Sequence, residues 1–419
     1  MFRKIVFWLH LVAGLIAGLA IGIMCFTGVV LAFEKQLVAW AERDARRIEA
    51  PAPDAARLTL TELTARVRTT EPEARPQAIT VSADPRDAVA FSLGRDNTLY
   101  AHPFTGEVRR PASETMHDFM HVMTDWHRWL ALGGDHRPIG KAINGAGNLA
   151  FFALALTGLY LWWPRSLSWR GVRAVALFNW RLTGKARDFN WHNSLGLWAA
   201  PVLIVLTLTA LPISYRWAAN GIYRLTGEEP PAQAGPGGAP AAPAFEIQRP
   251  TPDARPLDPD ALLAIARTQV PDWSTLTLRL GNGPQRGAAP ASTGNPAATE
   301  RRPAREAGGE RSERRGPQAA TVIARTPDSW PRTATTTLTL HPFTGEVLRR
   351  EGFADLSAAR QIRSWTRFLH TGEALGWPGQ LVAGLASLAG CVLVYTGFAL
   401  SWRRFFPRRR AASQPAPSA

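Results

Sequence analysis

Four long apolar runs are the strongest constraint on how this 419-residue chain can fold. A helix of about 20 apolar residues crosses the ~30 Å hydrocarbon core of a bilayer. Each run reaches that length, and the polar stretches between them are too long to be simple loops. The sequence therefore predicts a multi-pass membrane protein with extramembrane domains. The runs are Ile5–Phe33, Ala142–Trp163, Trp191–Tyr215 and Gly379–Trp402.

The first run is predicted to remain in the protein as an anchor. It is roughly twice as long as the apolar region of a secretory signal peptide, which spans about 7–15 residues. No small-x-small cleavage site follows it before Glu34.

Basic residues beside the spans predict the orientation of the chain. They precede span one, crowd the loop between spans two and three, and follow span four. These segments are expected to be cytoplasmic, with both large domains outside and both termini cytoplasmic. Much of the formal net charge of +15 lies there, which argues against nucleic acid as a partner and leaves the lipid bilayer. The residues are Arg3, Lys4, Arg165, Arg170, Arg173, Arg181, Lys185, Arg187, Arg403, Arg404, Arg408, Arg409 and Arg410.

One histidine stands at or near the start of each span. With the predicted topology, His10 and His192 lie on the cytoplasmic side and His127 and His370 on the outer side. Ionisable groups at membrane depth are costly and usually functional. Two imidazoles saturate a haem iron, so two per leaflet could hold two stacked b-type haems as metal ligands. No Cys-x-x-Cys-His occurs, so such haems would be held without covalent attachment.

Each of these histidines also has a structural interpretation. His10 could bond to a carbonyl of a neighbouring helix, and His192 could be an ordinary interfacial side chain. The Gly14, Gly18 and Gly22 ladder could clear a helix face for a flat macrocycle, or could serve helix packing.

Other histidines compete with His127. His117 and His121 are four residues apart and would share a helix face that could bind a metal, and His136 lies close by in the sequence. Neither His117 nor His121 has a counterpart in the second half of the chain, which favours His127.

The chain contains an internal repeat. The segment from Leu99 to Arg110 recurs from Leu338 to Arg349, at an offset of 239 residues (His102 to His341). The same offset relates Thr157-Gly158 to Thr396-Gly397. Each half therefore has the order span, outer domain, histidine, span.

Each outer domain is predicted to be a small α+β unit. In the first, a helix at Thr59–Thr70 with Thr59 or Thr61 as N-cap precedes strands near 78–81, 88–93 and 98–101. In the second, a helix at Pro259–Gln269 precedes strands near 276–280, 321–324 and 335–340. His102 and His341 fall in the repeated His-Pro-Phe-Thr-Gly-Glu turn and are expected to be structural.

The composition between 281 and 317 is rich in Gly, Pro, Ala and Arg and predicts a disordered insertion.

The four spans and the two outer domains together predict the fold class, a four-helix membrane core with two periplasmic α+β domains. The predicted boundaries are 1–35 for span one, 36–115 for outer domain one, 116–164 for an interfacial helix and span two, 165–189 for a cytoplasmic loop, 190–216 for span three, 217–355 for outer domain two, 356–403 for an interfacial helix and span four, and 404–419 for a cytoplasmic tail.

No nucleotide-binding fingerprint, Walker loop or His-Glu-x-x-His motif is present. If the chain moves electrons, its donor would be another protein, such as a flavoprotein, or a diffusing reductant such as a quinol. Arg128, Arg187 and Arg367 lie beside candidate ligands and could pair with haem propionates.

The chain resembles the PepSY-associated transmembrane family, which includes ferric-siderophore reductases and iron-regulated membrane proteins of the inner membrane. The motifs that carry the resemblance are Trp8-Leu-His10, Trp126-His-Arg128, Leu159-Tyr-Leu-Trp-Trp-Pro164, Asn190-Trp-His192 and Leu369-His-Thr-Gly372. The outer units resemble PepSY domains.

The resemblance implies a four-helix core with two b-type haems that delivers electrons outward to ferric chelates such as siderophores. The implied ligands are His10, His127, His192 and His370, and the implied activity is transmembrane ferric-chelate reduction. A different interpretation is a non-redox PepSY protein that binds peptides or regulates a protease at the outer face. A transporter with histidine proton relays is disfavoured because the spans contain no carboxylates.

Overall fold

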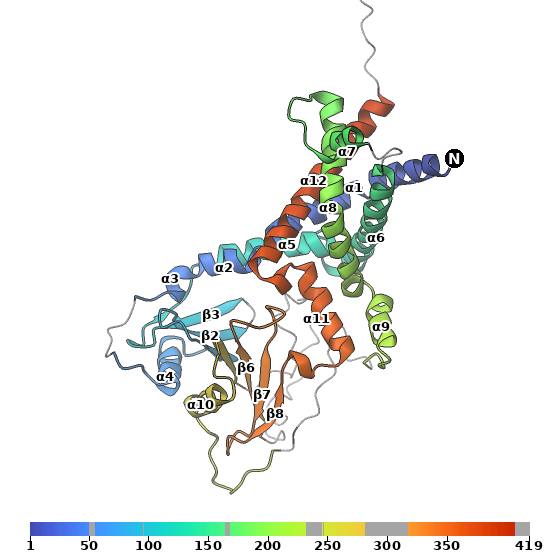
Figure 1. The fold of residues 1–419 in the computed structure, drawn as a ribbon. Coiled ribbons are helices and arrows are strands. Elements are labelled where there is room, and N and C mark those ends of the chain that lie inside the picture. The colour runs from blue at the N-terminus through green and yellow to red at the C-terminus, as the bar shows by residue number, and fades with distance from the viewer. Residues whose placement is uncertain are drawn as a thin grey trace, which may run out of the picture.

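The computed structural model describes residues 1–49, 55–94, 96–163, 168–231, 245, 247–280 and 317–406. A helical bundle carries a β-sheet domain at one end (Figure 1). The predicted insertion at 281–317 lies almost entirely outside the described residues.

Four long helices form the bundle, and each is long and apolar enough to cross a membrane. α1 packs against α6 and α12, and α8 packs against the same two helices, so α1 and α8 lie on a diagonal. Large apolar side chains such as Leu19 and Leu385 remain exposed on the outside, where lipid would cover them. The chain is therefore a multi-pass membrane protein. The helices are α1 Phe2–Leu31, α6 Arg137–Trp162, α8 Gly184–Ser214 and α12 Trp377–Phe405.

α8 begins at Gly184, seven residues before the predicted start of the third span at Trp191. The sequence predicted a loop here because Arg187, Asp188 and Asn190 are polar. In the structure Asp188 is fully buried and paired with Arg187 and Arg403. These partners satisfy the carboxylate, so the extra turns stay helical.

Shorter helices connect the bundle to the sheet. α5 carries His127, α11 carries His370, and both helices lie at the sheet-facing end of the bundle. α5 packs against α1 and α6, whereas α11 packs against α8. α7 lies at the opposite end (Figure 1). The shorter helices are α2 Glu34–Ala41, α3 Arg43–Arg46, α5 Glu114–Trp129, α7 Trp169–Ala176, α9 Arg216–Leu225 and α11 Ala358–His370, with short 3₁₀ turns at Gly134–His136, Phe353–Asp355 and Glu373–Leu375.

The described strands form one antiparallel sheet of eight, in the order β4-β3-β2-β1-β5-β6-β7-β8. The first four strands belong to the first half of the chain and the last four to the second. The halves meet where β1 pairs with β5, with Ile79 opposite Leu278. The strands are β1 Ala78–Ser82, β2 Val89–Gly94, β3 Asn97–Ala101, β4 Val108–Arg109, β5 Thr275–Arg279, β6 Ala320–Arg325, β7 Thr336–Leu340 and β8 Val347–Glu351.

Two helices, α4 Leu60–Thr70 and α10 Pro259–Gln269, pack on the sheet and share one continuous core with it. Alternate strand residues such as Ile79, Phe91 and Leu276 are fully buried in that core. Thr59 caps α4: its hydroxyl accepts from the Glu62 N–H, and the Glu62 carboxylate accepts from the Thr59 N–H.

The predicted helices and strands of the two outer units are present, but the units do not form separate domains. The sequence predicted two α+β units; the structure joins them edge to edge into one sheet. An exposed β1 or β5 edge would leave backbone N–H and C=O groups unpaired, and pairing the two edges satisfies them.

Candidate functional site

The four predicted histidines lie at two levels of the bundle. His10 on α1 and His192 on α8 lie near the N-terminal ends of the two diagonal helices. His127 on α5 and His370 on α11 lie beside the C-terminal halves of those same helices, at the sheet-facing end. Each level takes one histidine from each half of the chain.

His127 and His370 face one another, with ring centroids 6.2 Å apart and an interplanar angle of 52°. A metal–imidazole bond is about 2.0–2.1 Å, and a ring centroid lies roughly 1.1–1.2 Å from each nitrogen, so two imidazoles on one metal have centroids roughly 6–6.5 Å apart. The observed separation would allow the two imidazoles to hold a single haem iron between them.

His10 and His192 form the second pair, at the other level. They come from helices on a diagonal, with α6 and α12 between them. His10 contacts Thr157 of α6, and His192 contacts Thr396 of α12.

In every one of the four histidines, Nδ1 has a hydrogen-bond partner on a neighbouring helix. Each Nδ1–partner distance is 2.9 Å. Within the described ranges no hydrogen bond reaches Nε2, the atom that would bind a metal. Holding one imidazole nitrogen while the other points to a metal is the usual arrangement of a histidine ligand. The partners are the hydroxyls of Thr157 for His10, Thr27 for His127 and Thr396 for His192, and the carbonyl of Leu206 for His370.

The pair at the sheet-facing end is held in the neutral form. Burial, helped by the neighbouring His370, lowers the pKa of His127 to about 4. Burial also lowers the pKa of His370. Neutral imidazoles keep a lone pair for a metal at neutral pH.

Two of the three competing histidines contact carboxylates instead. His117 Nε2 lies 3.2 Å from Glu42 Oε1, and His121 Nε2 lies 2.8 Å from Asp96 Oδ2. In the part of the chain that the structure describes, no cluster of three or more His, Cys, Asp or Glu side chains is arranged to hold a metal ion. A haem iron held by two histidines needs only two such side chains.

His102 and His341 have the structural role predicted for them. Nδ1 of His102 accepts from the N–H of Phe104 and of Thr105, each at 3.2 Å. His341 accepts from the corresponding N–H groups of the second half. Both therefore fix the repeated turn.

The three arginines named as candidate propionate partners differ in their surroundings. Arg187 is already paired with the buried Asp188. Arg128 stacks over Trp129 at 4.8 Å. Arg367 has a buried Nε without a hydrogen-bond partner, and burial lowers its pKa. An unsatisfied buried guanidinium N–H is costly, so Arg367, three residues before His370, fits an anionic group best.

Sequence reasoning missed a second such guanidinium. Arg137, at the start of α6, also has a buried Nε without a partner and stacks over Trp129 at 3.9 Å. In the sequence it was indistinguishable from other basic residues at span ends.

The glycine ladder of α1 serves helix packing. A Cβ built on Gly18 would lie 2.7 Å from the Phe398 ring, and one on Gly22 would lie 3.5 Å from Val394. Both glycines therefore face α12 side chains, as the packing interpretation of the ladder predicts.

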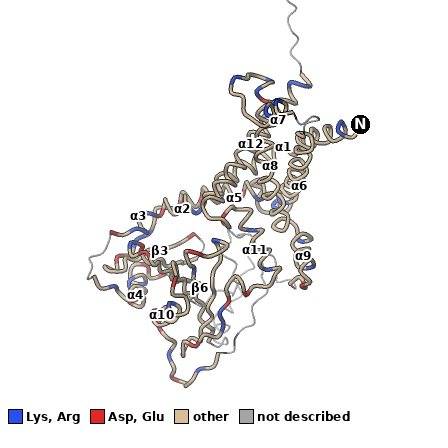
Figure 2. The backbone as a smooth tube through the Cα atoms, in the orientation of Figure 1, with Lys and Arg blue, Asp and Glu red and all other residues tan. Residues whose placement is uncertain are grey.

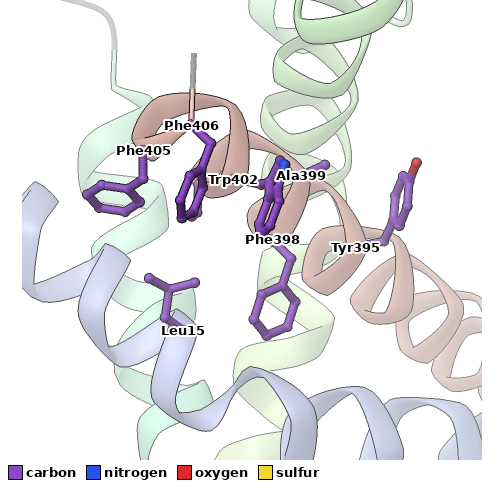
Figure 3. Close-up of a pocket in the computed structure, with 8 residues that line it drawn as sticks. Leu15, Tyr395, Phe398, Ala399, Trp402, Phe405 and Phe406 are labelled. Carbon is purple, nitrogen blue, oxygen red and sulfur yellow. The ribbon is translucent and has the colours of Figure 1, made fainter. Parts of the chain in front are cut away.

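An apolar pocket of about 460 Å³ lies between α1 and α12, at the end of the bundle away from the sheet. Figure 3 shows Leu15 of α1 beside the ring of Phe398 and below the rings of Phe405 and Phe406. Tyr395 and Phe398 flank Thr396-Gly397, so the pocket adjoins the helix segment that holds His192. The mostly apolar side chains that line the pocket suit contact with a hydrocarbon group.

The threonines that hold the histidines were also missed as site residues. Thr157-Gly158 and Thr396-Gly397 stood out as a repeat, but nothing in the sequence tied them to a histidine. The sequence did carry a signal for the third threonine, Thr27. Thr27 and Thr209 are 182 residues apart, the same separation as His10 and His192.

Comparison with curated proteins found no match. A model of the family described as the PepSY-associated TM region matches residues 7–404, which include all four spans, the sheet and all four histidines. The chain therefore belongs to the PepSY-associated TM region family.

Proposed function

We propose that this protein is a di-haem b inner-membrane protein that carries electrons from the cytoplasmic side to a ferric chelate outside, as a transmembrane ferric-chelate reductase. The observation that carries the proposal is the facing pair of His127 and His370 at 6.2 Å. It is supported by the matching pair of His10 and His192 at the other level.

The residues fit haem in three respects. The imidazoles of His127 and His370 have the spacing of two axial ligands. All four ligand histidines present Nε2 without a competing hydrogen bond from the described residues. Arg137 and Arg367 offer buried N–H groups to propionates. Haem, if held by two of these histidines, would supply an iron that changes oxidation state with little rearrangement.

Two levels suit transfer across a membrane. His10 and Thr27, which holds His127, are 17 residues apart on α1, a rise of roughly 25 Å at 1.5 Å per residue. The protein holds one histidine pair at each level, and apolar helix faces exclude water between them. Each electron step is then shorter than the membrane is thick.

Charge supports the direction of transfer. Lys and Arg residues gather at the bundle end away from the sheet, around α7 and the N-terminus (Figure 2). By the positive-inside rule this end is cytoplasmic. The sheet and the His127/His370 pair then lie on the outer side, where a ferric siderophore or another ferric chelate would be reduced. The donor, a flavoprotein or a quinol, would act at the His10/His192 level.

The test is an ultraviolet–visible spectrum of detergent-purified protein before and after dithionite, with a pyridine-haemochrome count. We expect a Soret band that shifts on reduction and about two haems per chain. His127→Ala or His370→Ala should each remove one haem, and His10→Ala or His192→Ala the other. His102→Ala, outside the site, should keep both.

A preparation that is colourless and takes up no haem would overturn the proposal. The sheet domain would then be tested as a peptide-binding or protease-regulating module. If two haems bind, oxidation of the reduced protein by ferric chelates is the next measurement.

A further inference from the structure

Three of the four histidines contact a Thr-Gly dipeptide of a neighbouring helix. His10 contacts Thr157-Gly158 of α6, His127 contacts Thr27-Gly28 of α1, and His192 contacts Thr396-Gly397 of α12. In each case Nδ1 lies 2.9 Å from the threonine Oγ1. A Cβ on the glycine would lie 3.4–3.7 Å from the imidazole Cε1. A side chain larger than methyl would displace the ring.

The proton of each threonine hydroxyl is already committed within its own helix. Each Oγ1 lies 2.7 Å from the carbonyl oxygen four residues earlier, for Thr27 that of Ile23, for Thr157 that of Ala153 and for Thr396 that of Val392. A hydroxyl has one proton to donate and two lone pairs that accept. The threonine oxygen must therefore accept from the imidazole, and Nδ1 must carry the proton.

These contacts fix the tautomer of the three histidines. A neutral imidazole protonated at Nδ1 has its lone pair on Nε2. The fourth histidine reaches the same state by another route: His370 Nδ1 lies 2.9 Å from the Leu206 carbonyl oxygen, which can only accept. The position of α8 that corresponds to Thr27-Gly28 of α1 holds Thr209-Ala210. The Thr209 hydroxyl donates to carbonyls of its own helix.

We propose that Thr27, Thr157 and Thr396 are positioning residues that fix the Nδ1–H tautomer and aim Nε2 at haem iron. This inference rests on the proposed function. It also distinguishes the two levels: His10 and His192 are both held by threonine, whereas His127 is held by threonine and His370 by a backbone carbonyl. An Nδ1–H donated to an oxygen makes the imidazole a stronger electron donor to the metal.

The test compares threonine-to-valine variants of the full chain. Valine keeps the branched shape and removes the acceptor. We expect Thr157→Val and Thr396→Val to weaken haem binding roughly 10–100-fold at one level, and Thr27→Val at the other. Any haem retained at the altered level should have a more positive midpoint potential. Thr→Ser at the same positions, which restores the hydroxyl, should restore both properties.

Thr207→Val is the matched control. Thr207 is 3% exposed and donates to the Leu203 carbonyl at 2.7 Å in the same way, but no histidine among the described residues hydrogen-bonds to its hydroxyl. It should leave haem content and both potentials unchanged.

Nitrogen-15 NMR of labelled histidines in haem-free protein reads the tautomer without the cofactor. We expect the Nδ1–H form in the parent protein and a mixture at the affected histidine in each valine variant. Valine variants that behave like Thr207→Val in haem content, potential and tautomer would overturn the inference while leaving the di-haem proposal intact. A parent protein without haem would overturn the proposed function instead.

Discussion

The carboxylate of Asp188, at the start of α8, is paired with the guanidinium of Arg403 at the end of α12. Asp188 is fully buried, and its other oxygen accepts from Arg187 at 2.9 Å. The contact with Arg403 ties α8 to the neighbouring α12 one turn before His192, and the contact with Arg187 stays within α8.

Replacing Asp188 with alanine should destabilise the bundle. The two arginines are each more than a third exposed, so water compensates part of the loss, and we expect about 2 kcal/mol rather than the roughly 3–5 kcal/mol of fully buried pairs. Unfolding in mixed detergent measures the change. Asp44→Ala removes an exposed pair with Arg43 and should cost less than about 0.5 kcal/mol; equal losses in the two variants would contradict this prediction.

A methyl group at Gly140 should disturb the α5–α6 junction that places His127. A Cβ there would lie 2.1 Å from the Trp129 carbonyl oxygen. Since backbone must move to relieve the clash, we expect Gly140→Ala to cost about 1–3 kcal/mol and to reduce haem at the His127/His370 level. Gly133, which has open space around it, is the control; if Gly133→Ala causes the same loss, the clash is not its cause.

Acid should weaken the attachment of α11, which carries His370. Glu228 accepts from the Ala359 N–H at 2.8 Å and the Ser357 hydroxyl at 2.7 Å. These bonds, the backbone one first, lower the pKa of Glu228 below 4.5. A carboxylate whose pKa is lowered by folding stabilises the protein above its unfolded pKa, and this stability is lost as pH falls below that value.

The measurement is the unfolding midpoint as a function of pH. Glu228→Gln should lower the midpoint at pH 7, and its difference from the parent protein should shrink as pH falls below about 4.5. The exposed neighbour Glu229 provides the control substitution. A difference that stays constant with pH would show that the charge of Glu228 is not responsible.

The two halves of the sheet should unfold together. Leu278 of β5 lies opposite Ile79 of β1 at the seam, and both are buried in the shared core. Leu278→Ala should cost about 2–5 kcal/mol. Hydrogen exchange should show loss of protection in both 78–101 and 320–351, whereas Arg279→Ala on the exposed side of β5 should affect neither. Loss confined to 320–351 would mean that the halves are independent.

The local elements of this fold could be predicted from the sequence because their signals are local. Alternating apolar residues such as Val89 and Phe91 mark a strand, and Thr59 followed by Glu62 marks a helix start. The β1–β5 seam left no such signal. It joins strands about 200 residues apart, and nothing near Ile79 indicates which edge it meets.

The histidines could be selected from the sequence because a titratable group at a membrane boundary is unusual. Their partners could not. Which side chain meets His10 depends on how α6 is rotated about its own axis, and that rotation is set by packing along the whole helix. The extra turns of α8 were missed for a similar reason, because Arg403, which satisfies Asp188, lies 215 residues away.

Both histidine pairs, like the sheet seam, draw one member from each half of the chain. A protein consisting of one half alone would have a bare β1 edge and a single imidazole at each level. Two copies of such a protein, related by a two-fold axis, would pair β1 with its own copy and complete both sites at once. Fusing the copies into one chain frees each half to diverge, as it has where Thr-Gly in α1 is matched by Thr-Ala in α8.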